Sequence, residues 1–283
     1  MIKIILVPMD GTERSAEVLY TALVVARRFD AHIKVVHVRT AGNEPTFFAE
    51  MPTSLREEFV KMNRKMTAST IDTVREQFKS FCENNKIKVT RKPSSVKEIS
   101  TSLHIMDGDV RTILDHESRL VDVITISRPA RLRVGGPGLS ELHESLMLHS
   151  GRPVLVVPPE WRARRASHAA VGWNDSVEAS RALALTLPWL TQMKKVSVLV
   201  SKKREASAPD VMDYLKRHGC RVDHHVFAGG GNVGQKMLAT CNEIGAELLV
   251  VGGFSHTRIR QRFFGGVTSY LLDNTDIVTV MAH

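Results

Sequence analysis

The sequence predicts an α/β protein with two tandem, open, mostly parallel five-stranded sheets and flanking helices. Short apolar runs without a helical period alternate with longer segments whose apolar residues recur at helical spacing. That alternation is typical of strands and helices in α/β folds. The same order of elements starts again after residue 167. The chain has 283 residues, which suits two domains that each bury a core.

The first domain begins with a strand, a helix and a second strand. The apolar run at 2–7 predicts the first strand, and 12–29 predicts a helix for which Thr12 is a suitable N-cap. HIKVVHV at 32–38 predicts the second strand. This order predicts a right-handed parallel unit with Asp10 at the carboxyl edge of the sheet, where open α/β sheets bind ligands. Asp10 can accept hydrogen bonds from a ligand, or it can only turn the chain or cap the helix.

The remaining elements of the first domain follow the same alternation, although the pattern at 88–102 is ambiguous. We expect a loop at 41–54, a long charged helix at 55–84, a strand at 102–106, a helix at 109–118, a strand at 121–126, a helix before the turn at Ser150-Gly151, and a last strand at 153–157.

A segment rich in proline and arginine separates the two repeats. We place the domains at 1–158 and 168–283, with a linker at 159–167. In the second domain, strands are expected near 168–173, 196–201, 220–227, 248–251 and 277–282, and helices near 176–190, 208–218, 231–245 and from Val267 onward.

The stretch at 250–272 carries a signal for ligand binding. Its strand ends at Gly252-Gly253, a basic and aromatic loop follows, and Gly265-Gly266 precede the last helix. Glycines let a backbone approach a ligand closely, and a helix N-terminus offers free N–H groups to an anion such as phosphate. Alternatively, these glycines only turn the chain and fit the helix onto the sheet.

This stretch resembles the nucleotide loop of the universal stress protein family, G-x-x-G, nine residues, G-[ST]. Gly252, Ser255, Gly265 and Gly266 stand at the four fixed positions, two of which depart from the pattern, and the continuation Val267-Thr268 resembles the family variant G-G-V-T. The segment VPMDGT resembles the part of the family that holds adenosine. The resemblance implies a Rossmann-like fold and the nucleotide-binding residues Pro8, Met9, Asp10, Gly11, Val38, Asn174, Val251, Gly252, Ser255, Gly265, Gly266, Val267 and Thr268.

The two repeats depart from the family pattern in different places. The first reads Ser127, Ala130, Ser140 and Glu141 at the loop positions, and a carboxylate at Glu141 would repel phosphate. The second has Asn174 in place of the aspartate. We therefore expect the C-terminal loop to make more phosphate contact than the N-terminal one.

The resemblance implies a cytoplasmic stress-response protein that binds ATP or another adenine nucleotide, with Mg²⁺ accompanying the phosphates, and acts through an unknown protein partner. It also implies that the strands around 153–157 and 277–281 pair, which makes the two halves an internal pseudo-dimer, with a homodimer as a further option. Two alternatives stay open. One is an interaction protein with relic loops that binds no nucleotide, and the other is a slow ATP hydrolase.

Composition limits the remaining classes of function. Hydrophobic and charged contents of 43% and 24% are those of a soluble globular protein, and no apolar run is long enough to cross a membrane. A net charge of +9 suggests anionic partners, but its wide spread does not favour nucleic acid. Three cysteines without a C-x-x-C pair predict no disulfide framework, and the twelve histidines show no metal-ligand spacing. We find no assigned acid to orient a Ser/His pair, so we expect no dedicated catalysis.

Overall fold

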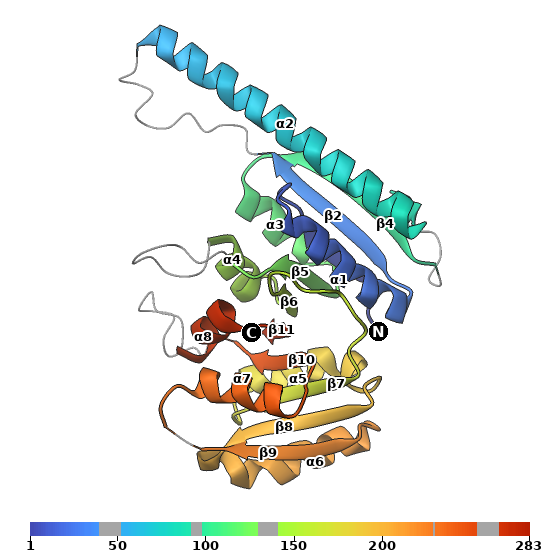
Figure 1. Cartoon of the computed structure of the whole chain (residues 1–283), viewed down its shortest axis with the longest axis vertical. Helices are drawn as coiled ribbons and strands as arrows, with labels where there is room; N and C mark the ends of the chain where they lie inside the picture. The colour runs from blue at the N-terminus through green and yellow to red at the C-terminus, as the bar shows by residue number, and fades with distance from the viewer. Residues whose placement is uncertain (40–51, 92–97, 130–140, 229, 254–265) are drawn as a thin grey trace.

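The computed structural model describes residues 1–39, 52–91, 98–129, 141–228, 230–253 and 266–283. Its strands form one twisted sheet with helices on both faces, and the α/β class predicted from the sequence is confirmed (Figure 1). The two tandem sheets meet edge to edge at their last strands and together form one sheet of eleven strands.

The first half of the chain supplies six strands and four helices among the described residues. They are β1 (Ile4–Pro8), α1 (Arg14–Phe29), β2 (His32–Arg39), α2 (Thr53–Asn85), β3 (Lys88–Val89), β4 (Ser100–Asp107), α3 (Val110–Ser118), β5 (Val123–Ser127), α4 (Glu141–His149) and β6 (Val154–Val157).

The second half follows the same alternation. Its elements are β7 (His168–Trp173), α5 (Val177–Leu190), β8 (Lys195–Ser201), the 3-10 helix η2 (Lys202–Ser207), α6 (Ala208–Arg217), β9 (Val222–Phe227), α7 (Val233–Glu243), β10 (Leu248–Gly252), α8 (Gly266–Asn274) and β11 (Val278–Ala282).

The two halves repeat one strand order. The sheet runs β3-β4-β2-β1-β5-β6-β11-β10-β7-β8-β9, so the first half reads β4-β2-β1-β5-β6 from its outer side and the second reads β9-β8-β7-β10-β11. Strands within each half are parallel. At the centre β6 and β11 pair in antiparallel fashion, with Leu155 opposite Val280. The expected pairing of these two last strands is therefore present.

Apolar residues fill a layer on each face of the sheet. Helices α1, α2, α5 and α6 pack on one face, and α3, α4, α7 and α8 pack on the other. Successive strand residues point to opposite faces, so Ile5 and Val7 enter the first layer and Leu6 enters the second. Each layer continues across the central strand pair, since Leu155 and Val280 belong to the same cluster. The halves therefore share two apolar layers instead of each enclosing a separate core.

Three local predictions differ from the structure. Helix α1 starts at Arg14 with Glu13 at its N-cap position, because Thr12 is instead bonded to Asp10. The ambiguous stretch before residue 102 contains β3 and the start of β4. Helix α2 begins at Thr53, inside the segment expected to be a loop, and residues 40–51 lie outside the described part of the chain.

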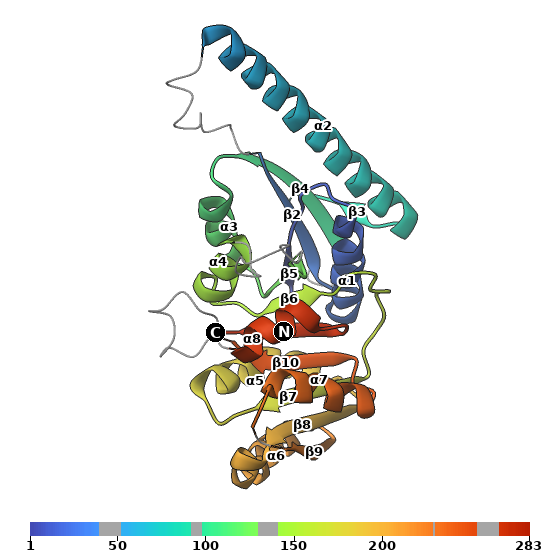
Figure 2. The ribbon, with the colours of Figure 1, turned by 60° about the vertical axis from the view of Figure 1, so that its left-hand side comes forward.

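Helix α2 is the longest helix, and its N-terminal part reaches beyond the strands on which it packs (Figures 1 and 2). Its second half contributes buried residues such as Val74 and Phe78 to the apolar layer. In its first half Met62 and Met66 are exposed. The second half of α2 is the part that lies near the carboxyl edge of β1.

Candidate functional site

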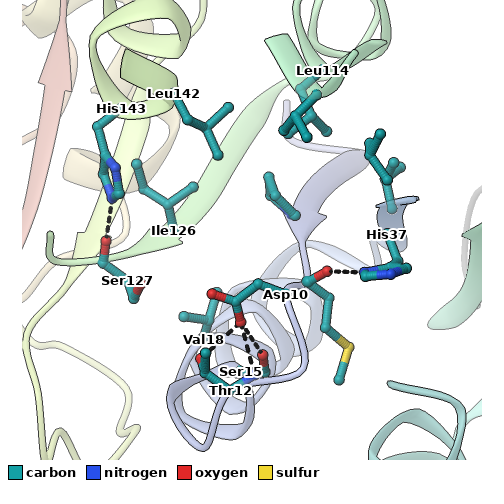
Figure 3. A pocket seen from close by; sticks show the side chains of 15 residues that line it. Asp10, Thr12, Ser15, Val18, His37, Leu114, Ile126, Ser127, Leu142 and His143 are labelled. Atoms are coloured by element: carbon teal, nitrogen blue, oxygen red, sulfur yellow. Dashed lines mark hydrogen bonds between the residues drawn. The ribbon is translucent and has the colours of Figure 1, made fainter. Parts of the chain in front are cut away.

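A pocket of about 260 Å³ lies at the carboxyl edge of the first half. It is bounded by the ends of β1, β2 and β5 and by the first turns of α1, α3 and α4 (Figure 3). Strand β1 pairs with β2 on one side and with β5 on the other, so the pocket lies where the strand order reverses direction. Open α/β sheets bind ligands at such switch points.

Asp10 organises the turn that forms one side of the pocket. Its Oδ1 accepts hydrogen bonds from the Thr12 backbone N–H at 2.9 Å, the Thr12 hydroxyl at 2.7 Å and the Ser15 hydroxyl at 3.1 Å. Within the described segments, Oδ2 of Asp10 accepts no hydrogen bond. Asp10 therefore holds the turn with one oxygen and presents the other to the pocket as an acceptor.

Gly11 allows this turn to form beneath α2. Its φ is +83°, in the left-handed region where glycine is favoured. A Cβ atom at this position would lie 3.2 Å from Cγ2 of Thr70 on α2. The Gln77 side chain also donates to the Gly11 carbonyl at 3.2 Å. The turn thus packs against α2 and accepts a hydrogen bond from it.

Two histidines lie on opposite sides of the pocket (Figure 3). Nδ1 of His37 donates to the Met9 carbonyl at 2.8 Å, and Nε2 of His143 donates to the Ser127 carbonyl at 2.9 Å. A carbonyl can only accept, which fixes a proton on each of these nitrogens. Burial lowers the pKa of His143, although the Ser127 carbonyl and Asp10 act in the opposite direction. The His143 ring is therefore mostly neutral at neutral pH.

The rest of the lining is mainly apolar. Asp10 is the only acidic residue among the described side chains that form the pocket, and neither lysine nor arginine is among them. The apolar walls come from Pro8, Met9, Val18, Val36, Val38, Val110, Leu114, Ile126 and Leu142. A mainly apolar pocket with one carboxylate among its described lining residues suits an apolar ring that carries hydrogen-bond donors.

The structure divides the predicted nucleotide residues between two places. Pro8, Met9, Asp10 and Val38 line the first-half pocket, and Gly11 follows Asp10 in the same turn. The predicted residues of the second half lie at β7, β10 and α8, away from this pocket. They are Asn174, Val251, Gly252, Gly266, Val267 and Thr268. Ser255 and Gly265 lie outside the described residues.

The second half builds an equivalent turn from different residues. Oδ1 of Asn174 accepts from the Ser176 backbone N–H at 3.3 Å, and the Ser176 hydroxyl accepts from the Ala179 N–H at 3.1 Å to cap α5. Asp175, at the position of Gly11, also has a left-handed φ of +61°. The turn geometry is therefore repeated without the carboxylate.

Gly252 has a packing role that the sequence does not reveal. A Cβ atom here would lie 2.5 Å from the Ala179 backbone nitrogen, because the first turn of α5 rests directly on the end of β10. At the corresponding position of the first half, Ser127 carries a side chain and lines the pocket. Val251 and Thr268 are buried, and a Cβ on Gly266 would meet nothing within 4 Å. The close contact between α5 and β10 thus explains a glycine at position 252 whether or not a ligand binds there.

Several lining residues were not predicted from the sequence. Ser15, His37, Leu114, Leu142 and His143 come from four elements that are distant along the chain. His37 adjoins Val38 at the end of a predicted strand, so its closeness to the carboxyl edge was a usable signal. His143 had no such signal, because its place depends on how α4 packs beside β5.

The described segments offer no group of three or more histidine, cysteine, aspartate or glutamate side chains placed to hold a metal ion. None of the described helices is both long enough and apolar enough to cross a membrane. Cys82, Cys220 and Cys241 are buried and unbridged. Burial raises the pKa of the Cys241 thiol to about 12, which makes it a poor nucleophile.

Comparison with known proteins gives a family match and a fold match. The model of the universal stress protein family matches residues 1–158. A universal stress protein from Archaeoglobus fulgidus DSM 4304 has a similar structure, with a TM-score of 0.69 at 15% sequence identity over 99% of this chain and 97% of that one. A putative universal stress protein from Pseudomonas aeruginosa UCBPP-PA14 has a TM-score of 0.60 at 14% identity, over 99% and 93%. No curated protein matches the sequence. Identities this low establish the fold alone, whereas the family model covers more than half of the chain.

Proposed function

The chain belongs to the universal stress protein family, and we propose that it is a stress-response protein that binds an adenine nucleotide in the first-half pocket. The observation that carries this proposal is the pocket of about 260 Å³ at the carboxyl edge, with Asp10 on one side and Val38 on an apolar wall. Its apolar walls suit a purine ring, and the free oxygen of Asp10 suits a ribose hydroxyl or an amino group. Binding at this site would act through a protein partner rather than through catalysis.

We also propose that residues 168–283 form a second domain of the same family. The repeated strand order and the repeated turn at Asn174 support this reading. A phosphate site at Gly252, Ser255, Gly265 and Gly266 remains part of the proposal for this half. If that site binds ATP, we expect a Mg²⁺ ion to accompany the phosphates.

The test is calorimetric titration of AMP into the full chain and into a Val38→Trp variant. Val38 is half-buried and lines the pocket, so an indole at this position should fill the space and abolish binding there. Val226→Trp, on the exposed part of β9, is the matched control and should bind AMP like the wild type. Thermal melting of both variants checks that they are folded. Unchanged AMP binding in Val38→Trp, or no AMP binding in the wild type, would contradict this assignment.

A further inference from the structure

The N-terminal part of α2 carries exposed apolar side chains along one side of the helix. Leu55, Met62 and Met66 keep 51%, 53% and 62% of their surface exposed. They are seven and four residues apart, and this spacing places side chains in one stripe along an α-helix. Figures 1 and 2 show that this part of α2 reaches beyond the strands on which the rest of the helix packs. We call these three residues the α2 stripe.

The α2 stripe is separate from the side of the helix that packs on the sheet. In the second half of α2, that side is formed by the buried residues Ile71, Val74 and Phe78. With 3.6 residues per turn, the stripe lies about a third of a turn away from these three residues. It is therefore not an extension of the buried core. Exposed apolar residues that gather in one place mark interaction surfaces, whereas single ones are normal.

Two charged residues beside the α2 stripe complement each other across a pair of identical helices. Glu58 and Lys65 are both exposed, and their separation of seven residues places them along the same flank of the stripe. In an antiparallel pair of helices, equal flanks face each other, so Glu58 of one copy lies opposite Lys65 of the other, and this contact occurs twice. In a parallel pair each flank faces the other flank, which does not join these two residues. The charges therefore favour an antiparallel pair.

The central strands of the sheet are not available to a second copy of the chain. Strands β6 and β11 already pair with each other, with Val154 opposite Met281. A symmetric contact between two copies uses the same surface on both, so that surface must complement itself. The α2 stripe meets this condition, because apolar side chains pack on their own kind and its flank carries one charge of each sign.

We propose that the N-terminal part of α2 is the surface through which two copies of this chain form a symmetric dimer. The two α2 helices pack antiparallel, with Met62 of both copies near the two-fold axis and Leu55 of one copy beside Met66 of the other. Glu58 pairs with Lys65 of the other copy on each side of the axis. A contact through one helix of each copy is small, so the dimer dissociates on dilution. The inference goes beyond the proposed function and does not depend on nucleotide binding.

The experiment is sedimentation equilibrium of the full chain, without nucleotide, at concentrations from about 1 to about 300 µM. We expect a monomer–dimer equilibrium for the wild type. Met62→Lys places one ammonium group of each copy near the axis and should raise the Kd of the dimer by about tenfold or more. Leu120→Lys is the matched control, because it changes an apolar residue after α3 that is 84% exposed, and it should leave the Kd unchanged. Thermal melting checks that both variants are folded.

A charge exchange tests the antiparallel orientation. Glu58→Lys places two like charges opposite each other at both contacts and should raise the dimer Kd by about tenfold. The double variant Glu58→Lys/Lys65→Glu restores both contacts between opposite charges, and its Kd should return to within about threefold of the wild-type value. Glu57→Lys is the matched control. It makes the same change at the neighbouring exposed position, which lies on the opposite side of α2 from the stripe, and it should keep the wild-type Kd.

Three results would overturn the proposal. A wild-type chain that stays monomeric over the whole concentration range would show that α2 joins no second copy. A dimer with an unchanged Kd in a folded Met62→Lys variant would place the contact between copies on another surface. A double variant that dimerises no more tightly than Glu58→Lys would contradict the antiparallel pairing of Glu58 with Lys65.

Discussion

At the scale of single residues, the same turn is built in both halves around a residue with left-handed backbone. Gly11 has φ +83° and Asp175 has φ +61°. The sequence predicts the turn at Asp10 from its place between a strand and a helix, but it does not reveal that α2 presses on Gly11 from above. Contacts of that kind depend on where a helix distant in sequence comes to lie.

We expect Gly11→Ala to be more destabilising than a left-handed backbone alone explains. The backbone term is about 1–2 kcal/mol, and the added methyl would also lie 3.2 Å from Cγ2 of Thr70 and 3.3 Å from Cγ2 of Val74. Gly219→Ala is the matched control, because Gly219 has the same φ of +83° and nothing within 4 Å of a Cβ. Chemical denaturation measures both. Equal losses in the two variants would show that α2 does not constrain the turn.

His32 predicts a pH dependence of stability. Its ring nitrogens bond the Ser100 and Ser102 hydroxyls at 2.9 Å, and burial, with smaller contributions from His104 and Lys34, lowers its pKa from 6.5 to about 4. The unfolded chain takes up a proton near pH 6.5 while the folded chain resists it. The stabilisation that the neutral His32 ring gives to the folded state is therefore complete above pH 6.5. It is lost as the pH falls toward 4, which lowers the free energy of unfolding by up to about 3 kcal/mol.

Denaturation curves between pH 7 and pH 4 test this dependence. In His32→Gln, the free energy of unfolding should decrease less between pH 7 and pH 4 than in the wild type. In His116→Gln, which changes an exposed histidine, it should decrease as much as in the wild type. The same slope in wild type and His32→Gln would contradict the assignment to His32.

At the scale of elements, periodicity in the sequence places the strands and helices to within a few residues. The main failures are at 88–102 and at the start of α2, where short or charged segments carry little apolar period. The sequence also does not predict the packing of α5 on β10. A helical pattern shows which residues are apolar, but it does not show how closely the backbone of the helix approaches that of the strand. Gly252 is therefore a candidate phosphate residue in the sequence and a helix–strand contact in the structure.

We expect Gly252→Ala to destabilise the second half strongly. Its methyl would lie 2.5 Å from the backbone of Glu178 and Ala179, which a side-chain rotation cannot relieve, so α5 must shift at a cost of about 1–3 kcal/mol or more. Gly253→Ala is the matched control, because its Cβ would lie 3.8 Å from the nearest atom. A thermal melt of each variant distinguishes them. Equal melting temperatures would mean that α5 does not rest on Gly252.

At the scale of the whole molecule, the two repeats share one sheet and two apolar layers. The family resemblance predicts the pairing of the last strands, but composition and periodicity alone cannot, because pairing across repeats leaves no local pattern. Arg28 of α1 links the first half to the rest of the chain. It donates hydrogen bonds to the Ala166 carbonyl at 3.1 Å and to the Gln192 side chain at 3.0 Å. Burial and the nearby Arg165 lower the pKa of Arg28.

We expect the chain to unfold in a single cooperative transition, because breaking either half exposes the shared layers and the β6–β11 edge. Differential scanning calorimetry should give equal calorimetric and van't Hoff enthalpies. Arg28→Ala should lower the one melting temperature, while Arg27→Ala, at an exposed neighbouring position, should not. Two separate transitions in the wild type would show that the halves are independent.

The central claim is that the ligand of this chain binds at the carboxyl edge of the first half. A crystal structure of the full chain soaked with AMP tests it most directly. We expect a purine ring in the pocket beside Val38, with a ligand hydroxyl or amino group donating to Oδ2 of Asp10. AMP bound only at the glycines that follow β10, with the first-half pocket empty, would contradict it.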